Sequence, residues 1–254
     1  MNGIQRMAEV EGLPLFVLPM TLAPGEVTTL RVFEPRYKQM LDTCILDDRP
    51  FGLVLSDPFR PVNGWDGPSN VGTIAHIEEH REVGSNHMIA IRGGARFAVN
   101  QVHEPALPPL DDPAVSDLLS EEGVLPPLEV LLDRAEDLGR SDLPLYLSAD
   151  VVVLDTPEPD EEDLERLEAM LRDGLMDLSE AMGVGAETAQ PWVDERIEAL
   201  LGGDAHPVLL ASSLVLPSAD ARQRVLEAES CEAMLDELEH GLHEVRETFR
   251  HDQT

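Results

Sequence analysis

The sequence predicts an α+β protein in which a strongly bent sheet or barrel precedes a helical bundle. Short apolar runs separated by proline, glycine, asparagine and aspartate extend to about Val102, a pattern typical of short strands joined by turns. Beyond Pro157-Glu158-Pro159 the apolar period changes from 2 to 3.6 residues, as expected of amphipathic helices. We therefore expect two domains, residues 1–157 and 158–254, in a chain of 254 residues that is long enough to bury a core.

The first half contains six apolar runs of strand length. They are Leu13–Leu18, Thr28–Phe33, Phe51–Leu55, Val71–Ile77, Met88–Arg92 and Ala95–Val102. Gly93-Gly94 separates the last two runs, and glycine readily takes the positive φ that a tight turn requires, so a hairpin is expected there. The segment Asp57–Asn70 is rich in proline, glycine and asparagine and is predicted to be a loop.

One helix is expected to interrupt the sheet and to pack on it. Pro35 suits the first turn of a helix, because its missing N–H has no partner there in any case. The apolar residues that follow fall on one helical face, and they are Tyr37, Met40, Leu41, Cys44 and Ile45.

Residues 103–145 are predicted to form an insertion before the last strand. This segment is rich in proline and contains two short helical patterns, near Val115–Ser120 and Leu128–Leu138. Tyr146–Leu154 then returns to the pattern of a strand.

The second half is predicted to be a helical bundle. A long apolar stripe runs from Leu164 to Met182 with helical spacing, and Gly183 marks its end. Further helices are expected at Pro191–Leu201, His206–Leu214, Ala219–Ala228 and Cys231–Phe249. Ser218 and Ser230 are suited to be N-caps of the last two, because a serine hydroxyl can accept a hydrogen bond from a free amide at a helix start.

The charge of the chain is strongly negative. Fifty acidic residues stand against 18 basic ones, of which Lys38 is the sole lysine, and the net charge is −32. Such a chain repels phosphate backbones, so nucleic-acid binding is not expected. Residues 1–105 have a net charge of −4 (9 basic, 13 acidic), whereas residues 106–254 have −28 (9 basic, 37 acidic). Adaptation to high salt and a simply acidic helical half both explain this distribution.

The cysteine content and the hydropathy indicate a cytoplasmic protein. Cys44 and Cys231 lie far apart and show no metal-binding spacing, and two cysteines cannot form a disulfide framework for a domain of this size. Glu9 and Glu11 interrupt the N-terminal apolar region, which disfavours a secretory signal, and no run reaches the ~18 apolar residues of a membrane span.

Motifs of ATP-driven proteolysis are absent from the sequence. A P-loop requires a glycine-rich turn followed by lysine and serine or threonine, but Lys38 follows Tyr37 and precedes Gln39. A Ser-Lys peptidase would also have to use Lys38, which lies on the amphipathic helix with no apolar pocket evident to lower its pKa. We therefore expect no catalytic residues of these kinds.

Two strings contain residue types that bind metals. His76-Ile77-Glu78-Glu79-His80 matches the pattern of inverted zinc peptidases, but the two imidazoles converge on one ion only in a helix. In a strand, which the alternation around His76 predicts, they would lie roughly 13 Å apart. The final helix carries acidic and histidine residues on one face, for which a solvated charged surface is the favoured interpretation; they are Glu237, His240, His243, Glu244 and Glu247. No metal or other cofactor is expected.

A resemblance to a known family rests on several strings in order. The most specific is Phe33-Glu34-Pro35-Arg36-Tyr37, preceded by Leu13-Pro14-Leu15-Phe16. Downstream elements with the same order contain Gly72, Gly94, Arg96 and Phe97. Together they resemble the amino-terminal domain of Lon proteases, in particular its free-standing bacterial and archaeal versions. This resemblance implies a PUA-like β fold joined to a helical bundle.

The resemblance also implies a role in recognising unfolded or degron-bearing protein segments, as a substrate-binding protein or an adaptor in protein quality control. In full Lon proteases an ATPase and a Ser-Lys peptidase follow this domain, whereas the sequence ends at Thr254. A protein without these two domains, working with a separate protease as partner, is therefore expected.

The family motif is interpreted as mainly structural. We expect Glu34 to accept hydrogen bonds from amides at the helix start, and Arg36 to pair with a carboxylate across the fold. Peptide contacts are assigned to apolar residues outside the motif, namely Phe59, Trp65 and Met88.

Two alternative functions stay open at this point. One is a zinc hydrolase that uses His76, Glu79 and His80. The other is RNA binding by the nearly neutral first half, through the residues Arg31, Arg36, Arg92 and Arg96.

Overall fold

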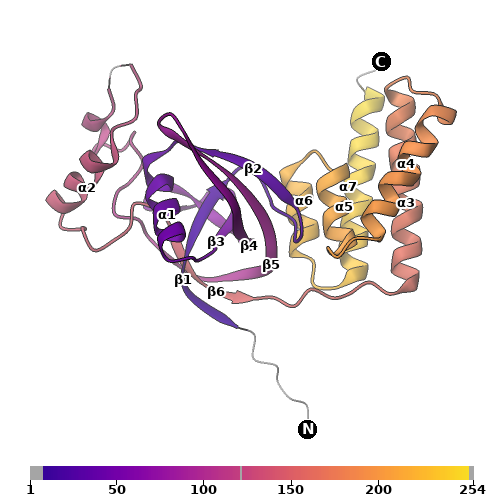
Figure 1. Ribbon diagram of the computed structural model, residues 1–254, viewed down its shortest axis with the longest axis horizontal. Helices are drawn as coiled ribbons and strands as arrows, with labels where there is room; N and C mark the ends of the chain where they lie inside the picture. The colour runs from indigo at the N-terminus through magenta and orange to yellow at the C-terminus, as the bar shows by residue number, and fades with distance from the viewer. Residues whose placement is uncertain (1–7, 121, 252–254) are drawn as a thin grey trace, which may run out of the picture. The chain divides into compact units, whose positions relative to one another are not determined.

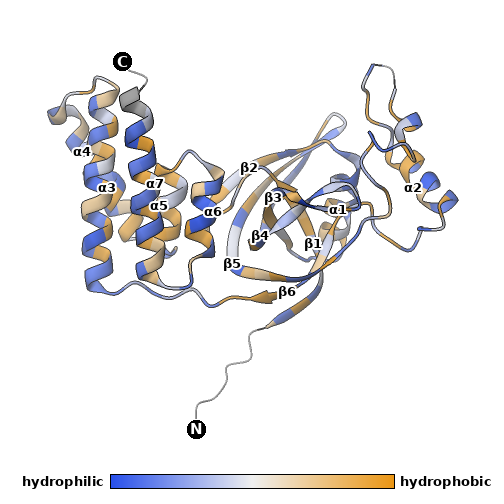
Figure 2. Ribbon diagram, turned by 180° about the vertical axis from the view of Figure 1, so that it is seen from behind, coloured by the Kyte–Doolittle hydropathy of each residue, from blue (hydrophilic) through white to orange (hydrophobic). Residues whose placement is uncertain are grey.

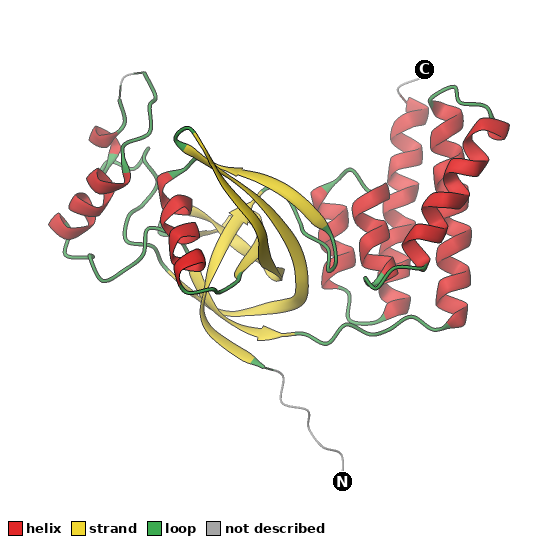
Figure 3. Ribbon diagram, in the orientation of Figure 1, coloured by secondary structure: helices red, strands yellow, loops and turns green. Residues whose placement is uncertain are grey.

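The structure is a computed structural model that describes residues 8–120 and 122–251. The chain divides into two compact units. The barrel unit contains the described residues up to Met20 together with Val27–Leu154. The helical unit contains Thr21–Glu26 and the described residues from Asp155 onward. Strands are confined to the first unit and long helices to the second, as Figure 3 shows, so the predicted α+β class is confirmed.

The strands of the barrel unit form one sheet that closes on itself (Figure 1). They are β1 (Glu9–Leu18), β2 (Val27–Val32), β3 (Phe51–Val62), β4 (Trp65–Val83), β5 (Asn86–His103) and β6 (Ser148–Val153). Their order is β2-β5-β4-β3-β1-β6, and β6 also pairs with β5, which closes a ring of five strands. β1 and β3 are parallel, and the other pairs are antiparallel. The expectation of a strongly bent sheet or barrel is thus confirmed.

The prediction of a loop at Asp57–Asn70 is wrong, because this segment forms the end of a long hairpin. β3 continues to Val62 and β4 begins at Trp65, with these two residues paired across the turn. Asn63 and Gly64 form the turn with φ of 48° and 83°. Positive φ at both central residues gives a twist that matches that of the flanking strands, which explains why Asn-Gly is favoured at this position.

The predicted hairpin turn at Gly93-Gly94 is also wrong. β5 runs without interruption through both glycines, and the chain turns earlier, at Gly84-Ser85, where Val83 pairs with Asn86. The glycine pair instead lies at a shift of register, where Thr73 pairs with Arg96 but Ala75 pairs with Gly93. A β-bulge at this point increases the local bend, as a closed sheet requires.

The barrel interior is filled by aliphatic side chains around one aromatic ring. The buried residues are Leu13, Leu15, Val17, Val54, Phe97, Leu147, Ala149 and Val151. The ring of Phe97 occupies space that a side chain at Gly72 would need, since a Cβ there would lie 2.6 Å from Phe97 Cζ. These two residues of the family motif therefore have a role in packing.

The helix of the barrel unit begins at Pro35 as predicted and forms α1 (Pro35–Leu46). Its buried residues include Tyr37, Met40, Leu41 and Cys44, whereas Ile45, predicted on the same face, is exposed. The hydroxyl of Tyr37 donates a hydrogen bond of 2.9 Å to the carbonyl oxygen of Val17 in β1. Packing and this buried bond fix α1 on the barrel.

The segment between β5 and β6 has a small core of its own. It contains a 3₁₀ turn at Ser116–Leu118 and α2 (Leu128–Asp137), close to the two predicted helical patterns. Its buried residues are Ala106, Leu107, Val115, Leu131, Ala135 and Leu145. The described part of this segment is therefore folded around its own core, and the segment is called the insertion below.

The described part of the helical unit contains five helices. They are α3 (Glu161–Ala181), α4 (Ala186–Leu201), α5 (Pro207–Val215), α6 (Ala219–Glu227) and α7 (Cys231–His251). α4 begins before Pro191, so the prediction that this proline opens the helix is wrong. The predicted N-caps are confirmed, because Ser218 Oγ accepts a hydrogen bond from Ala221 N and Ser230 Oγ accepts one from Ala233 N.

The bundle core is formed by apolar faces of α3, α4, α5 and α7, and Figure 2 shows the polar and apolar residues along α3 and α7. Leu171 and Leu238 are representative buried residues. The segment Thr21–Glu26, which the sequence placed in the β half, packs in this unit with Leu22 buried completely. None of the helices among the described residues is long and apolar enough to cross a membrane.

Candidate functional site

The family motif at the start of α1 is organised around the side chain of Arg36. Its guanidinium carbon lies 3.6 Å from the centroid of the Trp65 ring and 4.2 Å from that of Tyr37. Arg36 Nε donates a hydrogen bond of 2.9 Å to Glu34 Oε2. The predicted pairing across the fold is therefore wrong, because the carboxylate belongs to a residue two positions earlier.

Glu34 does not cap the helix with its side chain, in contrast to the sequence-based expectation. Its backbone carbonyl accepts hydrogen bonds from the amides of Tyr37 and Lys38, at 3.1 and 3.0 Å. Because the carboxylate is bound to Arg36, the motif positions a cation over Trp65 instead of neutralising the helix start.

Trp65 connects the motif to the insertion. Its indole Nε1 donates a hydrogen bond of 2.9 Å to the carbonyl oxygen of Leu107. Trp65 and Arg36 line a small apolar cavity of about 40 Å³ together with side chains of the insertion. The other lining residues are Glu34, Pro35, Leu107, Pro108, Leu110, Leu125, Leu131 and Leu145. The motif and the insertion thus build one cavity.

A larger depression adjoins this cavity and shares Pro35 and Leu125 with it. It has a volume of about 730 Å³ and is called the α1 groove here. Its lining residues are Arg31, Phe33, Pro35, Lys38, Ser85, Asn86, Val124, Leu125, Pro126, Pro127 and Leu128. The groove is therefore built by three parts of the barrel unit: the start of α1 with the end of β2, the β4–β5 turn, and the insertion.

The α1 groove combines exposed apolar side chains with cations. Phe33 is 52% exposed and Val124 is 60% exposed, so both present apolar surface to the groove. Arg31 and Lys38 are the charged residues of the lining. Lys38 Nζ donates a hydrogen bond to the backbone carbonyl of Ser85, so this contact joins α1 to the β4–β5 turn.

Of the three residues predicted to contact peptides, Trp65 lines the cavity beside the groove. Phe33 and Pro35, which were predicted to be structural, line the groove itself. Phe59 lies on β3 outside both and is 91% exposed. Met88 lies on β5 opposite Arg31 and outside both cavities.

The remaining motif residues are structural positions inside or near the barrel. Arg96 is only 2% exposed, and burial lowers the pKa of its guanidinium from the ordinary value. Gly94 gives room to the His76 ring, since a Cβ there would lie 2.8 Å from His76 Nε2. These residues shape the barrel and do not line the groove.

The residues of the zinc-peptidase pattern lie on β4, which is a strand over its whole length. His76, Glu79 and His80 line a third cavity of about 300 Å³, beside Cys44. His80 is engaged with His87 across the β4–β5 turn, with Nε2 and Nδ1 2.8 Å apart and the rings stacked. Among the described residues no group of three or more metal-binding side chains is arranged to hold an ion.

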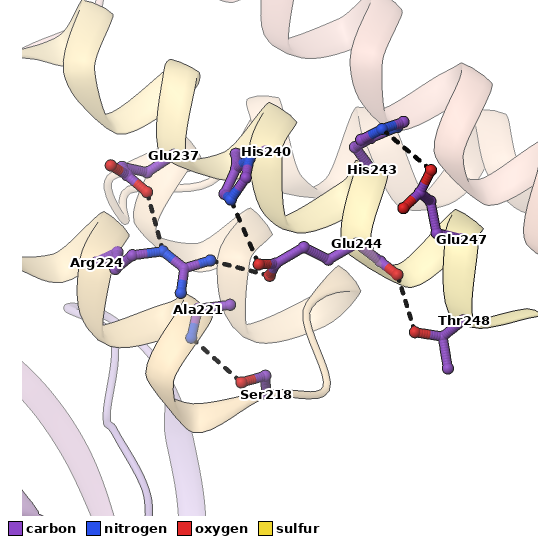
Figure 4. A network of polar contacts seen from close by, with 9 residues as sticks. All are labelled: Ser218, Ala221, Arg224, Glu237, His240, His243, Glu244, Glu247 and Thr248. Atoms are coloured by element: carbon purple, nitrogen blue, oxygen red, sulfur yellow. Dashed lines mark hydrogen bonds and ion pairs between the residues drawn. The ribbon is translucent and has the colours of Figure 1, made fainter.

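The acidic face of α7 is paired with an arginine of α6 (Figure 4). Arg224 Nε contacts Glu237 at 3.0 Å, and its Nη2 atom contacts Glu244 at 2.9 Å. His240 and His243 form i,i+4 pairs with Glu244 and Glu247. This arrangement links two helices through charged side chains.

The arginines suggested for RNA binding do not form a common basic surface. Arg36 is bound to Glu34, and Arg92 is bound to Glu78. Arg96 is buried, whereas Arg31 lines the α1 groove. Two of the four arginines are thus paired with glutamates, one is buried and one lines the groove.

Sequence reasoning missed the contribution of the insertion to the groove. Val124-Leu125-Pro126-Pro127 forms part of its lining. The available signal was an apolar and proline-rich run that follows two acidic residues and a glycine. Its spatial neighbours lie about ninety positions earlier in the chain, so no local pattern indicates the contact.

Comparisons with known proteins identify the family. The model of the ATP-dependent protease La (LON) substrate-binding domain matches residues 12–244. The crystal structure of a Lon N-terminal domain protein from Xanthomonas campestris is similar, with a TM-score of 0.51, 19% identity and coverage of 90% of this chain and 97% of that one.

The N-terminal domain of the Mycobacterium avium complex Lon protease has a TM-score of 0.56 and 14% identity, with coverage of 92% and 98%. These two likenesses show the fold, whereas the search of curated proteins gives no match. Because the family model matches nearly all of the sequence, the chain belongs to the family of Lon substrate-binding domains.

Proposed function

We propose that this chain is a non-catalytic recognition module that binds unfolded or degron-bearing protein segments in the α1 groove. In this role it serves as an adaptor or substrate-binding protein in protein quality control and delivers segments to a separate protease. The observation that carries the proposal is the groove, which is lined by the exposed apolar side chains of Phe33 and Val124 and adjoins the cavity that Arg36 and Trp65 line.

The lining of the groove suits an extended apolar segment. Covering the exposed surfaces of Phe33 and Val124 removes apolar area from water, which contributes about 25 cal/mol for each Å². Pro35, Pro126 and Pro127 have φ angles fixed by their rings, so ordering this part of the lining costs little backbone entropy. Exposed apolar surface of this kind is typical of an interaction site.

The small cavity beside the groove suits one aliphatic side chain. Its volume is about 40 Å³, enough for roughly three water molecules. Arg36 and Trp65 hold one wall in place through stacking and the two hydrogen bonds described above. A preformed cavity lowers the ordering cost of binding.

The chemistry of the groove also supports binding without catalysis. A Ser-Lys hydrolase needs its lysine amine to take a proton from the serine hydroxyl. Lys38 and Ser85 both line the groove, but Lys38 Nζ donates to the backbone carbonyl of Ser85. The lysine is thereby directed to a carbonyl oxygen that has no proton to give.

A binding measurement with an unfolded protein tests the proposal. Fluorescence anisotropy of labelled, reduced and carboxymethylated lactalbumin should show binding to this chain, and folded lactalbumin should not compete. The variants Phe33→Ser and Val124→Ser should weaken binding at least about tenfold, because each removes an apolar contact near the centre of the site.

Leu46→Ser is the matched control, since Leu46 is 83% exposed on α1 and does not line the groove. It should leave the affinity within about twofold of the unchanged protein. Absence of binding by the unchanged protein, or equal losses in Leu46→Ser and Phe33→Ser, would show that the α1 groove is not the binding site.

A further inference from the structure

The charge of the α1 groove is opposite to that of the chain. Its charged lining residues are Arg31 and Lys38, and none of its eleven lining residues is aspartate or glutamate. The net charge of the whole chain is −32. Residues 106–254 contain 37 of the 50 acidic residues, whereas Arg31 and Lys38 lie in the first part of the chain, residues 1–105, which contains 13. The groove is thus a local cationic site on a strongly acidic protein.

The two cations are available for a ligand, unlike most arginines of the barrel unit. Five of those arginines form ion pairs, namely Arg36, Arg60, Arg92, Arg134 and Arg140. Among the described residues, no carboxylate lies within 4.0 Å of the charged atoms of Arg31 or Lys38. Lys38 uses one of its three donors for the Ser85 carbonyl, so two remain.

We propose that the α1 groove selects extended protein segments in which apolar residues are accompanied by aspartate or glutamate side chains. This inference rests on the proposed function and specifies in addition that the recognised segment is negatively charged. Apolar side chains contact Phe33 and Val124, and the acidic side chain forms charge-assisted hydrogen bonds with Arg31 and Lys38.

The groove is less suited to the carboxylate at a chain end. Proteins that capture a terminal carboxylate surround it with several backbone N–H groups. Pro35, Pro126 and Pro127 line the groove and have no N–H to donate. The groove therefore binds an anion through the side chains of Arg31 and Lys38. The carboxylate of an aspartate or glutamate inside a segment can reach these side chains without any backbone N–H group.

The overall charge of the protein predicts the opposite preference. If long-range attraction by the charge of −32 governed binding, a lysine-containing segment would bind most tightly and a glutamate-containing one least. If the contacts in the groove govern binding, the order is reversed. At physiological ionic strength the screening length is about 8 Å, which favours the contacts over the distant acidic residues.

Three synthetic peptides distinguish these cases. Each is short, fluorescein-labelled and amidated at its C-terminus, with leucines in a glycine-serine background followed by a pair of glutamates, glutamines or lysines. The glutamate peptide should bind about threefold to tenfold more tightly than the glutamine peptide at physiological salt, because two exposed charge contacts are gained. The lysine peptide should bind most weakly. A non-amidated glutamine peptide should bind no more tightly than the amidated one.

Charge reversal in the groove supplies the second test. Arg31→Glu and Lys38→Glu should each abolish the preference for glutamate over glutamine, measured in each variant as the ratio of its affinities for the two peptides. Arg196→Glu changes the net charge equally on the exposed surface of α4 and should retain the preference. Thermal unfolding of each variant, compared with the unchanged chain, reports whether its fold is preserved.

The outcomes separate the two proposals. Equal binding of all three amidated peptides, or the order lysine, glutamine, glutamate, overturns the charge selection and leaves the proposed function standing. A gain on removing the amide assigns the anion site to chain ends and also overturns the inference. If no peptide and no unfolded protein binds, the proposed function fails and the selection fails with it.

Discussion

The guanidinium group of Arg36 lies against the ring of Trp65, with 3.6 Å between its central carbon and the ring centroid. This contact joins the start of α1 to the β3–β4 hairpin, and Trp65 in turn donates a hydrogen bond to Leu107 of the insertion. Three segments that are distant in sequence are therefore held together by one stacked pair. The most specific string of the family motif acts by organising the wall of the cavity beside the α1 groove.

Replacement of Arg36 should test this organising role. Arg36→Leu should lower the free energy of unfolding by about 1–2 kcal/mol, because it removes a partly desolvated cation–π contact. Arg36→Lys should restore only part of the loss, since a tetrahedral ammonium group has no planar face to stack on the ring. Arg60→Leu is the control, because its pair with Asp57 is exposed and should contribute less than about 1 kcal/mol. Urea denaturation measures all three, and equal losses at Arg36 and Arg60 would contradict the expected role.

Helices were predictable from the sequence because their signals are local. α1 begins at Pro35, and the stripe from Leu164 marks α3, since the period of 3.6 residues appears directly in the order of side chains. The strands β3 and β4 are longer than predicted, because the apolar pattern that marks a strand is present only where the strand is buried. The outer parts of β3 and β4, such as Pro58–Pro61 and Glu79–Val83, are exposed, so they show no alternation of apolar and polar residues.

The two glycine-containing errors have different causes. Gly93-Gly94 was assigned to a turn because glycine favours turns, but the pair serves a bulge that is specified by pairing with β4. Asn63-Gly64 is one of the strongest hairpin signals, and the prolines around it obscured the flanking strands. The α1 groove could not be predicted at all, because Phe33 and Val124 come together only through the fold.

Gly72 should be sensitive to the smallest substitution. In Gly72→Ala the added methyl group would overlap the Val54 side chain and lie 2.6 Å from Phe97 Cζ and 2.8 Å from the Leu53 carbonyl oxygen. Overpacking of a filled core costs typically about 1–3 kcal/mol. The melting temperature should therefore fall by several degrees in a calorimetric scan. Gly185→Ala is the control, because a methyl group added at Gly185 would meet no heavy atom within 4 Å, and a comparable fall there would refute the packing argument.

Stability should decline in alkaline solution through the ionisation of Cys44. Burial raises the pKa of this thiol from 9.0 to about 11. Between these two values the unfolded chain loses a proton that the folded chain retains, so the unfolded state binds fewer protons and unfolding becomes more favourable as pH rises. The stabilisation is complete below about pH 9 and is lost as pH approaches about 11.

Cys44→Ala should flatten this decline, since alanine has no proton to lose. The measurement is the free energy of unfolding in urea at several pH values from neutral to about pH 10. The variant should be less stable at neutral pH because it leaves a small cavity, and the difference from the unchanged chain should shrink as pH rises. A constant difference over the whole range would assign the alkaline decline to other groups, among them Tyr37, whose pKa burial raises to about 12.

Gly25 should control the stability of the helical unit, although it precedes the helices of that unit by more than a hundred residues. The segment Thr21–Glu26 belongs to the helical unit, where Leu22 is completely buried and Ala23 is buried beside it. Gly25 has φ of 83°, a conformation that costs other residues roughly 1–2 kcal/mol. A side chain at this position would also overlap the Cβ of Ala205.

The variant Gly25→Ala should therefore loosen the helical unit, because the added methyl group overlaps Ala205 in the loop between α4 and α5. Hydrogen exchange should accelerate at amides of the helical unit, whereas amides of β3 and β4 in the barrel unit should keep their protection. Gly84→Ala is an informative control, because Gly84 also has a positive φ, of 63°, but no heavy atom lies within 4 Å of the added methyl group. Gly84→Ala has the conformational cost of a positive φ without the steric overlap. If hydrogen exchange accelerates more in Gly25→Ala than in Gly84→Ala, the difference reports the packing of Gly25 against Ala205. Unchanged exchange in the helical unit of Gly25→Ala would show that the segment contributes nothing to its stability.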